Sequence, residues 1–362
     1  MPPFTRPLLF FFLLSSLSLA SSSSSSFSLS LPLTSRLLSS SSSSMSKTKQ
    51  SLVGTTSSQP YNFRTSFKYS MALVVSLPIG TPPQSQDMVL DTGSQLSWTQ
   101  CNKTLPRGSS FDPSLSSSFS ELSCTHPLCK PRIPDYTLPT SCDQNQLCHY
   151  SYFYADGTLA EGNLVREKFT FSPSEITPPL ILGCAQGGTE DKGILGMNLG
   201  RLSFASQAKI FKFSYCVPVR SARTGLATGS FYLGENPNSK GFQYVGLLTF
   251  PQSQRMPNLD PLAYTVPMQG IRIGNAKLAV PVSAFRPDPS GSGQTFVDSG
   301  SEFTYLVDEA YDKVRAEVVR LVGPKMKKGY VYAGVADMCF DQANAVEIGR
   351  LIGNLVFEFD KG

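Results

Sequence analysis

Two four-residue segments with the same order of residue types could carry out acid–base chemistry. They are Asp91–Ser94 and Asp298–Ser301, one in each half of the chain. Each follows an apolar run, which predicts a buried strand that delivers a carboxyl group into the interior. The glycine lets a neighbouring backbone approach closely, and the hydroxyl groups can donate hydrogen bonds to the carboxylate. The residues predicted to support the two acids are Thr92, Gly93, Ser94, Ser299, Gly300 and Ser301.

A single copy of this segment is weak evidence, because Asp-Thr-Gly also occurs in ordinary turns. Two copies indicate a pair of facing carboxyl groups, Asp91 and Asp298. Such a pair cannot ionise fully, so it shares one proton and titrates as a unit. The ionised member can then take a proton from a water molecule that attacks a carbonyl carbon. The protonated member stabilises the oxyanion and later protonates the leaving group.

The composition predicts the kind of scaffold that holds these acids. The 362 residues are 40% hydrophobic and 16% charged, with 28 glycines and 27 prolines, which favours a turn-rich, mainly β protein. The net charge of +5 comes from scattered residues, which argues against nucleic acid as a partner. The chain has two histidines, His126 and His149, and this small number argues against a zinc site and against a Ser-His-Asp mechanism. We therefore expect no metal and no cofactor.

The first 68 residues are predicted to lie outside the folded domains. Residues 1–20 resemble a secretory signal peptide, with a positively charged residue near the start, a short apolar run and small residues at the expected cleavage site. The apolar run is too short to span a membrane. Residues 21–68 are rich in serine and are predicted to be a disordered leader or pro-segment. Eight cysteines fit an oxidising compartment, and Asn102-Lys103-Thr104 is a candidate glycosylation site. The expected address is the cell wall, the vacuole or the endoplasmic reticulum.

The rest of the chain repeats one unit. An apolar strand, the Asp-containing segment and an aromatic-bearing region occur twice, and residues 308–322 give the clearest helix, with Asp308 as its N-cap. This repetition predicts two similar lobes. The first spans residues 69–220, with a cysteine-rich insertion at 101–148, and the second spans residues 221–362.

These residues resemble the pepsin-like aspartic proteases, and more narrowly the nepenthesin-type group of plants, near the promotion-of-cell-survival branch. The resemblance runs from about Tyr69 to the last residue. Besides the two Asp-containing segments, its motifs are Ile79–Gln84, Trp98–Cys101, Tyr154–Thr158, Gly193–Gly196 and Phe213–Cys216. It implies a bilobal fold with a few short helices, monomeric, that cleaves protein or peptide substrates with an acidic optimum.

The resemblance also implies roles for particular residues. Asp91 and Asp298 match the catalytic pair. Tyr154 matches the tyrosine at the tip of a flap over the substrate, and Trp98 matches the residue that hydrogen-bonds it. The disulfides implied are Cys101–Cys184, Cys124–Cys148 and Cys129–Cys142.

The sequence departs from the family pattern near its end. The first lobe has Gly193–Gly196 behind its catalytic loop, and the expected counterpart in the second lobe is not found. The cysteines Cys216 and Cys339 also lack their usual partners. The second lobe is therefore expected to be incomplete through C-terminal truncation. Two alternatives to an active endopeptidase stay open: a non-catalytic binding or inhibitor protein on the same scaffold, and an inactive truncated product.

Overall fold

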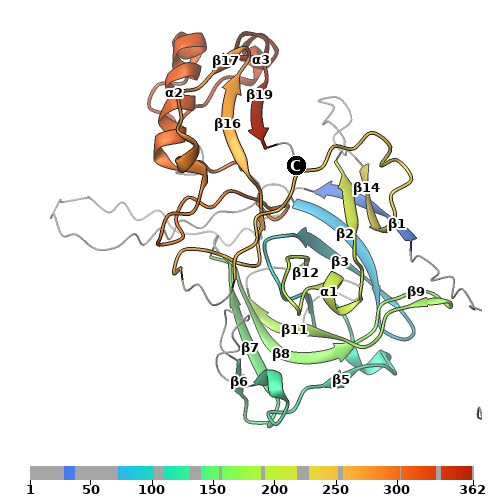
Figure 1. Cartoon of the computed structure of the whole chain (residues 1–362). Helices are drawn as coiled ribbons and strands as arrows, with labels where there is room; N and C mark the ends of the chain where they lie inside the picture. Colours follow the sequence, from blue (N-terminus) through green and yellow to red (C-terminus); the bar gives the residue numbers. More distant parts are fainter. Residues whose placement is uncertain are drawn as a thin grey trace, which may run out of the picture.

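The computed structural model describes residues 28–36, 72–101, 110–129, 140–154, 157–188, 192–217, 228–251, 256–301, 303–331 and 336–360. The predicted signal peptide and Asn102 lie outside these residues. Within them the protein is mainly β, as predicted, with short helices. Figure 1 shows a larger body that carries most of the strands and a smaller body formed by the orange and red part of the chain.

A 12-stranded sheet forms the larger body, which we call the first lobe. Its strands follow the order β13-β14-β1-β2-β3-β12-β4-β11-β8-β7-β6, with β5 paired to β8. Their bounds are β1 Ser28–Arg36, β2 Ala72–Ile79, β3 Gln84–Asp91, β4 Trp98–Gln100, β5 Ser120–Glu121, β6 Thr140–Cys142, β7 Cys148–Phe153, β8 Leu159–Glu167, β11 Leu180–Gly188, β12 Gly193–Gly196, β13 Phe213–Cys216 and β14 Thr228–Gly234. The hairpin of β9 Thr170–Ser172 and β10 Glu175–Ile176 and the short helix α1 Phe204–Gln207 complete it.

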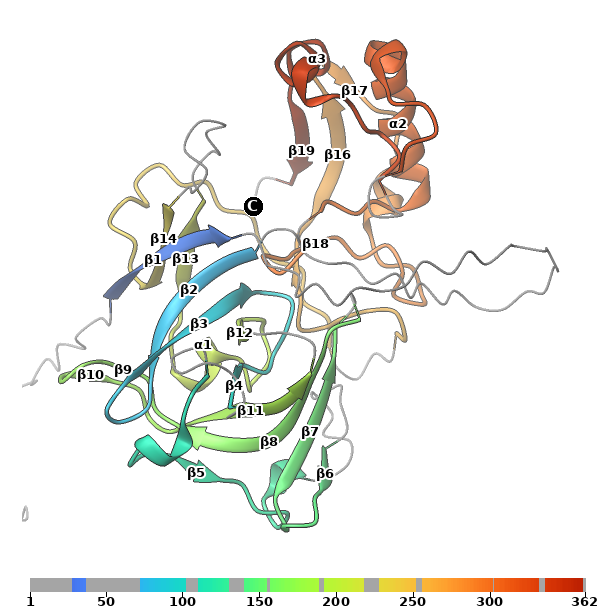
Figure 2. The ribbon, with the colours of Figure 1, turned by 180° about the vertical axis from the view of Figure 1, so that it is seen from behind.

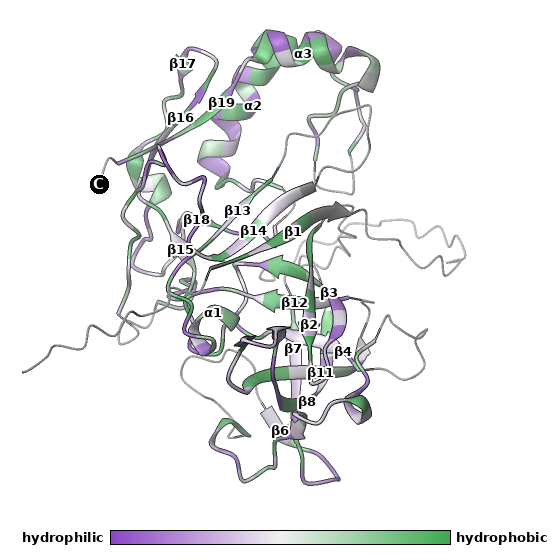
Figure 3. Ribbon diagram, turned by 90° about the vertical axis from the view of Figure 1, so that its right-hand side faces the viewer, coloured by the Kyte–Doolittle hydropathy of each residue, from purple (hydrophilic) through white to green (hydrophobic). Residues whose placement is uncertain are grey.

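Alternating apolar residues explain why these strands build one core. In β2, Val75, Leu77 and Ile79 are all fully buried, and in β3 Met88 and Leu90 are fully buried as well. Successive side chains of a strand point to opposite faces, so this period of two places one row of side chains inside. Figure 3 shows apolar residues recurring along the central strands of the sheet. Large aromatic side chains also pack in this core, including Phe169, Phe204 and Phe231.

The prediction of a disordered leader is wrong for residues 28–36. These residues form β1, an interior strand that pairs with β14 on one side and β2 on the other. Although the leader is rich in serine, leucine occupies every second position in part of this segment, so Leu29, Leu31 and Leu33 share one face of the strand. Leu33 is 1% exposed, so this face is buried in the core of the first lobe.

The second lobe is smaller and is built around a three-stranded sheet. Its order is β17-β16-β19, with β16 Met268–Ile273, β17 Ala276–Lys277 and β19 Leu355–Phe359. The helices α2 Asp308–Val322 and α3 Ala345–Ile352 accompany it, and Figure 2 shows them beside the strands. Short 3-10 turns occur at Pro113–Leu115, Pro127–Cys129, Val282–Phe285, Gly323–Lys325 and Gln342–Asn344.

The helix α2 has the predicted bounds but not the predicted cap. Its N-cap is Val307, without a capping side chain, and Asp308 is the first helical residue. There its negative charge interacts favourably with the positive end of the helix dipole. The buried side chains are Ala310, Val314, Val318 and Val322, which lie four residues apart and form one stripe facing the core.

The two lobes meet close to the two Asp-containing segments. The first sheet includes β14, so the boundary predicted at residue 220 is too early and would divide the hairpin of β13 and β14. Across the interface, Tyr264 Oη donates to Met197 O at 2.7 Å, and Leu199 N donates to Leu262 O at 2.9 Å. A further two-stranded sheet joins β15 Tyr264–Thr265 to β18 Phe296–Val297. None of the helices in the described ranges is long and apolar enough to cross a membrane.

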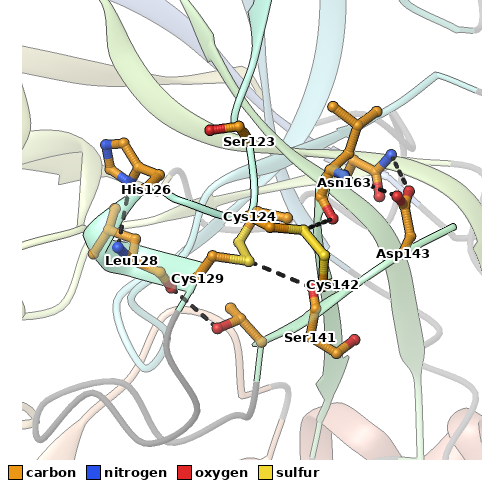
Figure 4. Close-up of a disulfide and its surroundings, with 12 residues drawn as sticks. Ser123, Cys124, His126, Leu128, Cys129, Ser141, Cys142, Asp143 and Asn163 are labelled. Carbon is orange, nitrogen blue, oxygen red and sulfur yellow. Dashed lines mark hydrogen bonds between the residues drawn. A yellow bond between two sulfur atoms is a disulfide. The ribbon is translucent and has the colours of Figure 1, made fainter. Parts of the chain in front are cut away.

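Three disulfides tie the cysteine-rich insertion to the sheet, and two of them differ from the implied pairing. Cys101–Cys184 is present, while the other bridges are Cys124–Cys142 and Cys129–Cys148. The implied pairs Cys124–Cys148 and Cys129–Cys142 are therefore wrong. The reason is local, because the β6–β7 hairpin places Cys142 opposite Cys148. Either of these two cysteines can therefore reach Cys124 or Cys129, and the spacing in the sequence does not determine which pairs form. Figure 4 shows the bridge between Cys124 and Cys142. Cys216 and Cys339 are free thiols.

Candidate active site

The first acid, Asp91, ends a strand that has partners on both sides. It is the last residue of β3, which pairs antiparallel with β2 and parallel with β12. Gly196 of β12 lies opposite Asp91, and Met197 N donates to Asp91 O at 2.8 Å. The side chain of Asp91 is buried, with 7% exposed. The predicted crossing of Gly193–Gly196 behind this loop is therefore what fixes the backbone of the acid.

The second acid, Asp298, directly follows β18, and its carboxyl group is held in the same way as that of Asp91. Gly93 N donates to Asp91 Oδ1 at 2.8 Å, and Gly300 N donates to Asp298 Oδ1 at 2.9 Å. Ser94 Oγ donates to Asp91 Oδ2 at 2.6 Å. Ser301 Oγ donates to Asp298 Oδ2 at 2.7 Å. Each acid therefore receives one amide and one hydroxyl hydrogen bond.

The middle hydroxyl residues of the two segments join the loops to each other. Ser299 N donates to Thr92 Oγ1 at 2.8 Å, and Thr92 N donates to Ser299 Oγ at 3.1 Å. Ser299 Oγ in turn donates to Leu90 O at 2.7 Å, one residue before Asp91. The sequence placed Thr92 and Ser299 beside the acids, but their contact across the lobes became visible only in the structure.

The two glycines leave room for the opposing acid. A Cβ atom built on Gly93 would lie 2.7 Å from Asp298 Oδ2, and one built on Gly300 would overlap Asp91 Oδ1. Each carboxyl group thus sits against the glycine of the other segment. This close approach is the structural reason for glycine at the third position of both segments.

The electrostatics of the pair keep a proton on it. Burial and then the negative charge of Asp298 together raise the pKa of Asp91 from 3.8 to about 7. The hydrogen bonds from Ser94 and Gly93 oppose this shift, because they favour the ionised form. At mildly acidic pH the arrangement therefore combines a proton donor and a carboxylate acceptor in one site.

A hairpin of β7 and β8 brings Tyr154 near the acids. Tyr154 N donates to Thr158 O at 2.9 Å, and Gly157 closes the turn with a φ of 87°, which glycine adopts without strain. Trp98 Nε1 donates to Tyr154 Oη at 2.7 Å, and the indole is fully buried. Burial, Tyr152 and the charge of Asp91 raise the pKa of Tyr154 well above 10, so it stays a neutral hydroxyl. This is the contact that the resemblance implied.

One further side chain near the second acid was missed by the sequence analysis. The pKa of Tyr215 in β13 is raised by burial and then by the negative charge of Asp298, so the tyrosine lies within electrostatic reach of that acid. The signal available was its place in the Phe213–Cys216 motif, to which no role had been given.

The surroundings of the two acids differ in one respect. A cavity of about 590 Å³ adjoins Asp298 and Ser301. Its walls are mainly apolar and aromatic, including Phe285, Phe296, Phe303, Tyr305, Phe357 and Phe359. Among the described residues, β18 pairs only with β15, and Phe296 and Val297 are nearly half exposed. The strand that precedes Asp298 is therefore less enclosed than the strand that ends in Asp91.

The two histidines, which were not expected to form a site, lie in or beside the cysteine-rich insertion, and Asn102 lies outside the described residues. His126 contacts Arg166, with 3.0 Å between His126 Nε2 and Arg166 Nη2, and His149 belongs to β7 in the insertion side of the sheet. No group of three or more His, Cys, Asp or Glu residues suited to a metal ion occurs in the described part of the chain.

Comparison with known proteins gives two consecutive family matches. The model described as "Xylanase inhibitor N-terminal" matches residues 73–235, and the one described as "Xylanase inhibitor C-terminal" matches residues 263–362. Together they cover more than half of the chain. The first match ends just after β14, which agrees with the lobe boundary in the structure.

Several curated plant proteins are similar over most of the chain. The chain is 37% identical over 292 residues to "Aspartic proteinase PCS1" of Arabidopsis thaliana, covering 76% of this chain and 63% of that protein. It is 33% identical over 304 residues to "Aspartic proteinase nepenthesin-1" of Nepenthes gracilis, covering 80% and 64%. It is 34% identical over 252 residues to "Aspartic proteinase nepenthesin-2" of the same plant, covering 67% and 54%. The chain thus spans between about half and two thirds of the length of these relatives.

Proposed function

The chain belongs to the pepsin-like aspartic protease family of plants, and we propose that it is an aspartic-type endopeptidase whose catalytic pair is Asp91 and Asp298. The observation that carries this proposal is the matched support of the two carboxyl groups. Each receives an amide and a hydroxyl hydrogen bond, and each faces the glycine of the opposite segment. A purely structural pair of acids gains nothing from such an arrangement, because it keeps two like groups close together at a cost in free energy.

The proposed reaction uses the shared proton. A water molecule held between the two carboxyl groups gives a proton to the ionised member as its oxygen attacks the peptide carbonyl carbon. The protonated member hydrogen-bonds the developing oxyanion. Collapse of the tetrahedral intermediate breaks the C–N bond, and a carboxyl group of the pair protonates the leaving amine. The pair ends with one proton, as it began.

The flap supplies the enclosure that this reaction needs. Tyr154 lies at the end of the β7–β8 hairpin and is oriented by Trp98. In this proposal Tyr154 covers the bound substrate and excludes bulk water. The exclusion of water strengthens the electrostatic interactions inside the site. Trp98 acts through Tyr154 and is therefore a positioning residue.

The substrate class proposed is protein or peptide, and the compartment proposed is the secretory pathway. The three disulfides agree with an oxidising compartment. The pKa of Asp91 near 7 supports an acidic optimum, because activity requires the shared proton and is lost as the pH rises past that value.

The experiment is cleavage of a denatured protein at mildly acidic pH. The 362-residue chain is compared with Asp91→Asn and Asp298→Asn variants, and peptide products are identified by mass spectrometry. Cleavage by the parent chain and loss in both variants supports the proposal. Cleavage that survives both substitutions excludes the pair as the catalytic group, and no cleavage by the parent chain excludes endopeptidase activity for this form.

A second candidate is a non-catalytic inhibitor of glycosidases. The observation in its favour is that both matching family models are described as xylanase inhibitor domains. The complete catalytic pair and its glycines favour the protease. Adding the chain to a xylanase assay separates the two: inhibition that is equal for the parent chain and Asp91→Asn supports the inhibitor, and an unchanged xylanase rate excludes it.

A further inference from the structure

A tyrosine of the second lobe hydrogen-bonds the residue that holds the backbone of the first acid. Tyr264, in β15, donates from its Oη to Met197 O at 2.7 Å. The amide of the same Met197 donates to Asp91 O at 2.8 Å, and Met197 is fully buried. The backbone of Asp91 is therefore connected to the second lobe through the two polar groups of one buried residue.

The main chain of Tyr264 lies beside the strand that leads into the second acid. In the pair of β15 and β18, Tyr264 is opposite Val297, which directly precedes Asp298. The pairing continues beyond these strands, where Val266 N donates to Thr295 O at 2.9 Å. Figure 3 shows β15 and β18 side by side. Tyr264 thus holds the strand before Asp298 with its main chain and reaches the first lobe with its hydroxyl group.

The ring of Tyr264 is held in place by the first lobe. Phe213 in β13 packs against it edge to face, with 6.0 Å between the ring centroids and 77° between the planes. Nearby, Leu199 N donates to Leu262 O at 2.9 Å across the same interface. Burial and then the neighbouring Tyr215 raise the pKa of Tyr264 to about 12. The hydroxyl group therefore keeps its proton and stays a hydrogen-bond donor at acidic and neutral pH.

This contact acts on a different side of the acids from the contact between Thr92 and Ser299. Those two residues directly follow the acids, whereas Tyr264 acts on the strands that lead into them. A loop held at one point can still pivot about that point, and a second contact on the other side prevents the pivot. The strand before Asp298 needs this support, because among the described strands β18 pairs only with β15.

We propose that Tyr264 is a positioning residue of the catalytic pair, whose hydroxyl group acts through Met197 to hold the carboxyl groups of Asp91 and Asp298 at their working separation. This inference rests on the proposed function, since it concerns the same two acids. Tyr264 acts through the backbone and touches no reacting atom. Its loss should slow the chemical step and leave substrate binding nearly unchanged, because displacements near 1 Å cost about a hundredfold in rate.

The first test compares two variants that each remove one phenol hydroxyl group. Tyr264→Phe keeps the ring that packs against Phe213. The control is Tyr232→Phe in β14, where the ring is 8% exposed and Tyr232 Oη accepts from Asn238 Nδ2 at 3.3 Å, away from both acid segments. We expect kcat on a peptide substrate to fall about tenfold in Tyr264→Phe, with KM and both constants of the control within about twofold of the parent. An unchanged kcat, a change in KM alone or equal losses in the two variants overturn the proposal.

The second test measures the separation of the acids without catalysis. Each chain is compared with its own Asp91→Asn derivative, and the difference in unfolding temperature is followed against pH. In the parent this difference grows above pH 3.8 and levels off past the pKa of Asp91, about 7. Burial raises the pKa of Tyr154 and of Tyr215, the phenols near the two acids, so both stay neutral over this range.

A wider separation weakens the repulsion that Asp298 exerts on Asp91. In Tyr264→Phe the levelling-off should therefore move to lower pH, by about half a pH unit, and in Tyr232→Phe it should stay in place. An unmoved levelling-off in Tyr264→Phe overturns the proposal.

The two tests together separate this inference from the proposed function. If the parent chain cleaves no substrate and the levelling-off still moves in Tyr264→Phe, the positioning role stands and the assignment as an endopeptidase fails. If the parent chain cleaves its substrate and Tyr264→Phe matches it in kcat and in the levelling-off, the endopeptidase stands and the positioning role fails.

Discussion

Thr92 and Ser299 hydrogen-bond each other in both directions across the two lobes. Ser299 N donates to Thr92 Oγ1 at 2.8 Å, and Thr92 N donates to Ser299 Oγ at 3.1 Å. Each residue directly follows one of the two acids, so this reciprocal contact sets the distance between the carboxyl groups. The alignment of the two acids is therefore a property of these two short loops.

Removing the Thr92 hydroxyl should disturb the alignment more than the fold. For Thr92→Val we expect kcat to fall about 10- to 100-fold with a nearly unchanged KM, because displacements near 1 Å cost about a hundredfold in rate. Steady-state kinetics on a peptide substrate measures this. Ser299→Ala should have a similar effect, and the double variant should lose less than the sum of the two single losses, since the two hydrogen bonds belong to one network. Strict additivity would contradict the reciprocal role. Thr125→Ala, at an exposed hydroxyl in the insertion, is the control.

Adding one methyl group at Gly93 should separate the two acids. Its Cβ would lie 2.7 Å from Asp298 Oδ2, well inside van der Waals contact. We expect Gly93→Ala to reduce kcat/KM about a hundredfold or more while the protein still folds. Gly246→Ala is the matched control, because nothing lies within 4 Å of the added atom there. Equal activity of the two variants would show that the acids do not approach each other this closely.

The raised pKa of Asp91 predicts a pH-dependent effect on stability. The stabilising contribution of its protonated form is complete below pH 3.8 and is lost as the pH rises through about 7. We therefore expect Asp91→Asn to unfold at a higher temperature than the parent at pH 7 and at a similar temperature at pH 3.5. The difference grows between these values, by at most about 1.4 kcal/mol per pH unit.

A control with the opposite sign is available in the insertion. Backbone hydrogen bonding to Leu147 N leads the effects that lower the pKa of Asp143. Its contribution to stability is present above pH 3.8 and is lost as the pH falls through the lowered pKa. Asp143→Asn should therefore destabilise the protein at pH 7 and have no effect well below the lowered pKa. Thermal unfolding over this range, followed by circular dichroism, checks both variants, and shifts of the same sign would contradict the assignment.

The contact between Trp98 and Tyr154 can be followed by fluorescence, because Trp98 is the single tryptophan. Tyr154→Phe removes the acceptor of the indole N–H and leaves it unpaired in a buried place, at a cost of about 1–3 kcal/mol. We expect stronger quenching of Trp98 by acrylamide and a kcat roughly tenfold lower. Phe153→Leu, at an exposed neighbour in β7, should change neither. Unchanged quenching in Tyr154→Phe would contradict the hydrogen bond between Trp98 and Tyr154.

The bridge Cys101–Cys184 should contribute more stability than its place at the edge of the insertion suggests. It closes a long loop, with a sequence separation of 83. For the double variant Cys101→Ser and Cys184→Ser we expect a loss of about 4 kcal/mol in the free energy of unfolding, since longer loops lose more entropy on closure. Denaturant titration measures it. The double variant Cys124→Ser and Cys142→Ser, which opens a separation of 18, should lose less.

The sequence predicted those features of the fold that depend on local pattern. The strands before both acids and the extent of α2 follow from apolar runs and helical spacing, while the hairpin beside Tyr154 was implied by the family resemblance. The hydrogen bonds of the acids were predicted in kind, because hydroxyl groups and glycine next to a buried carboxylate have few other partners.

Features that depend on distant contacts were not predictable. Residues 28–36 look like leader by composition, and their strand forms because β2 and β14 offer two edges and a buried groove for three leucines. The disulfide pairs depend on which of two adjacent cysteines faces Cys124, a matter of hairpin geometry. The contact of Thr92 with Ser299 joins residues 207 positions apart and is fixed only when the lobes meet.

The hydrogen bonds of Ser299 also determine when the two acids can reach their final arrangement. The acceptor of its hydroxyl group, Leu90 O, and the partner of its amide, Thr92 Oγ1, both belong to the first lobe. The loop that carries Asp298 therefore takes its final shape only after the two lobes have docked, however early each of them folds by itself. If the pair is catalytic as proposed, activity should appear during refolding with a delay relative to secondary structure.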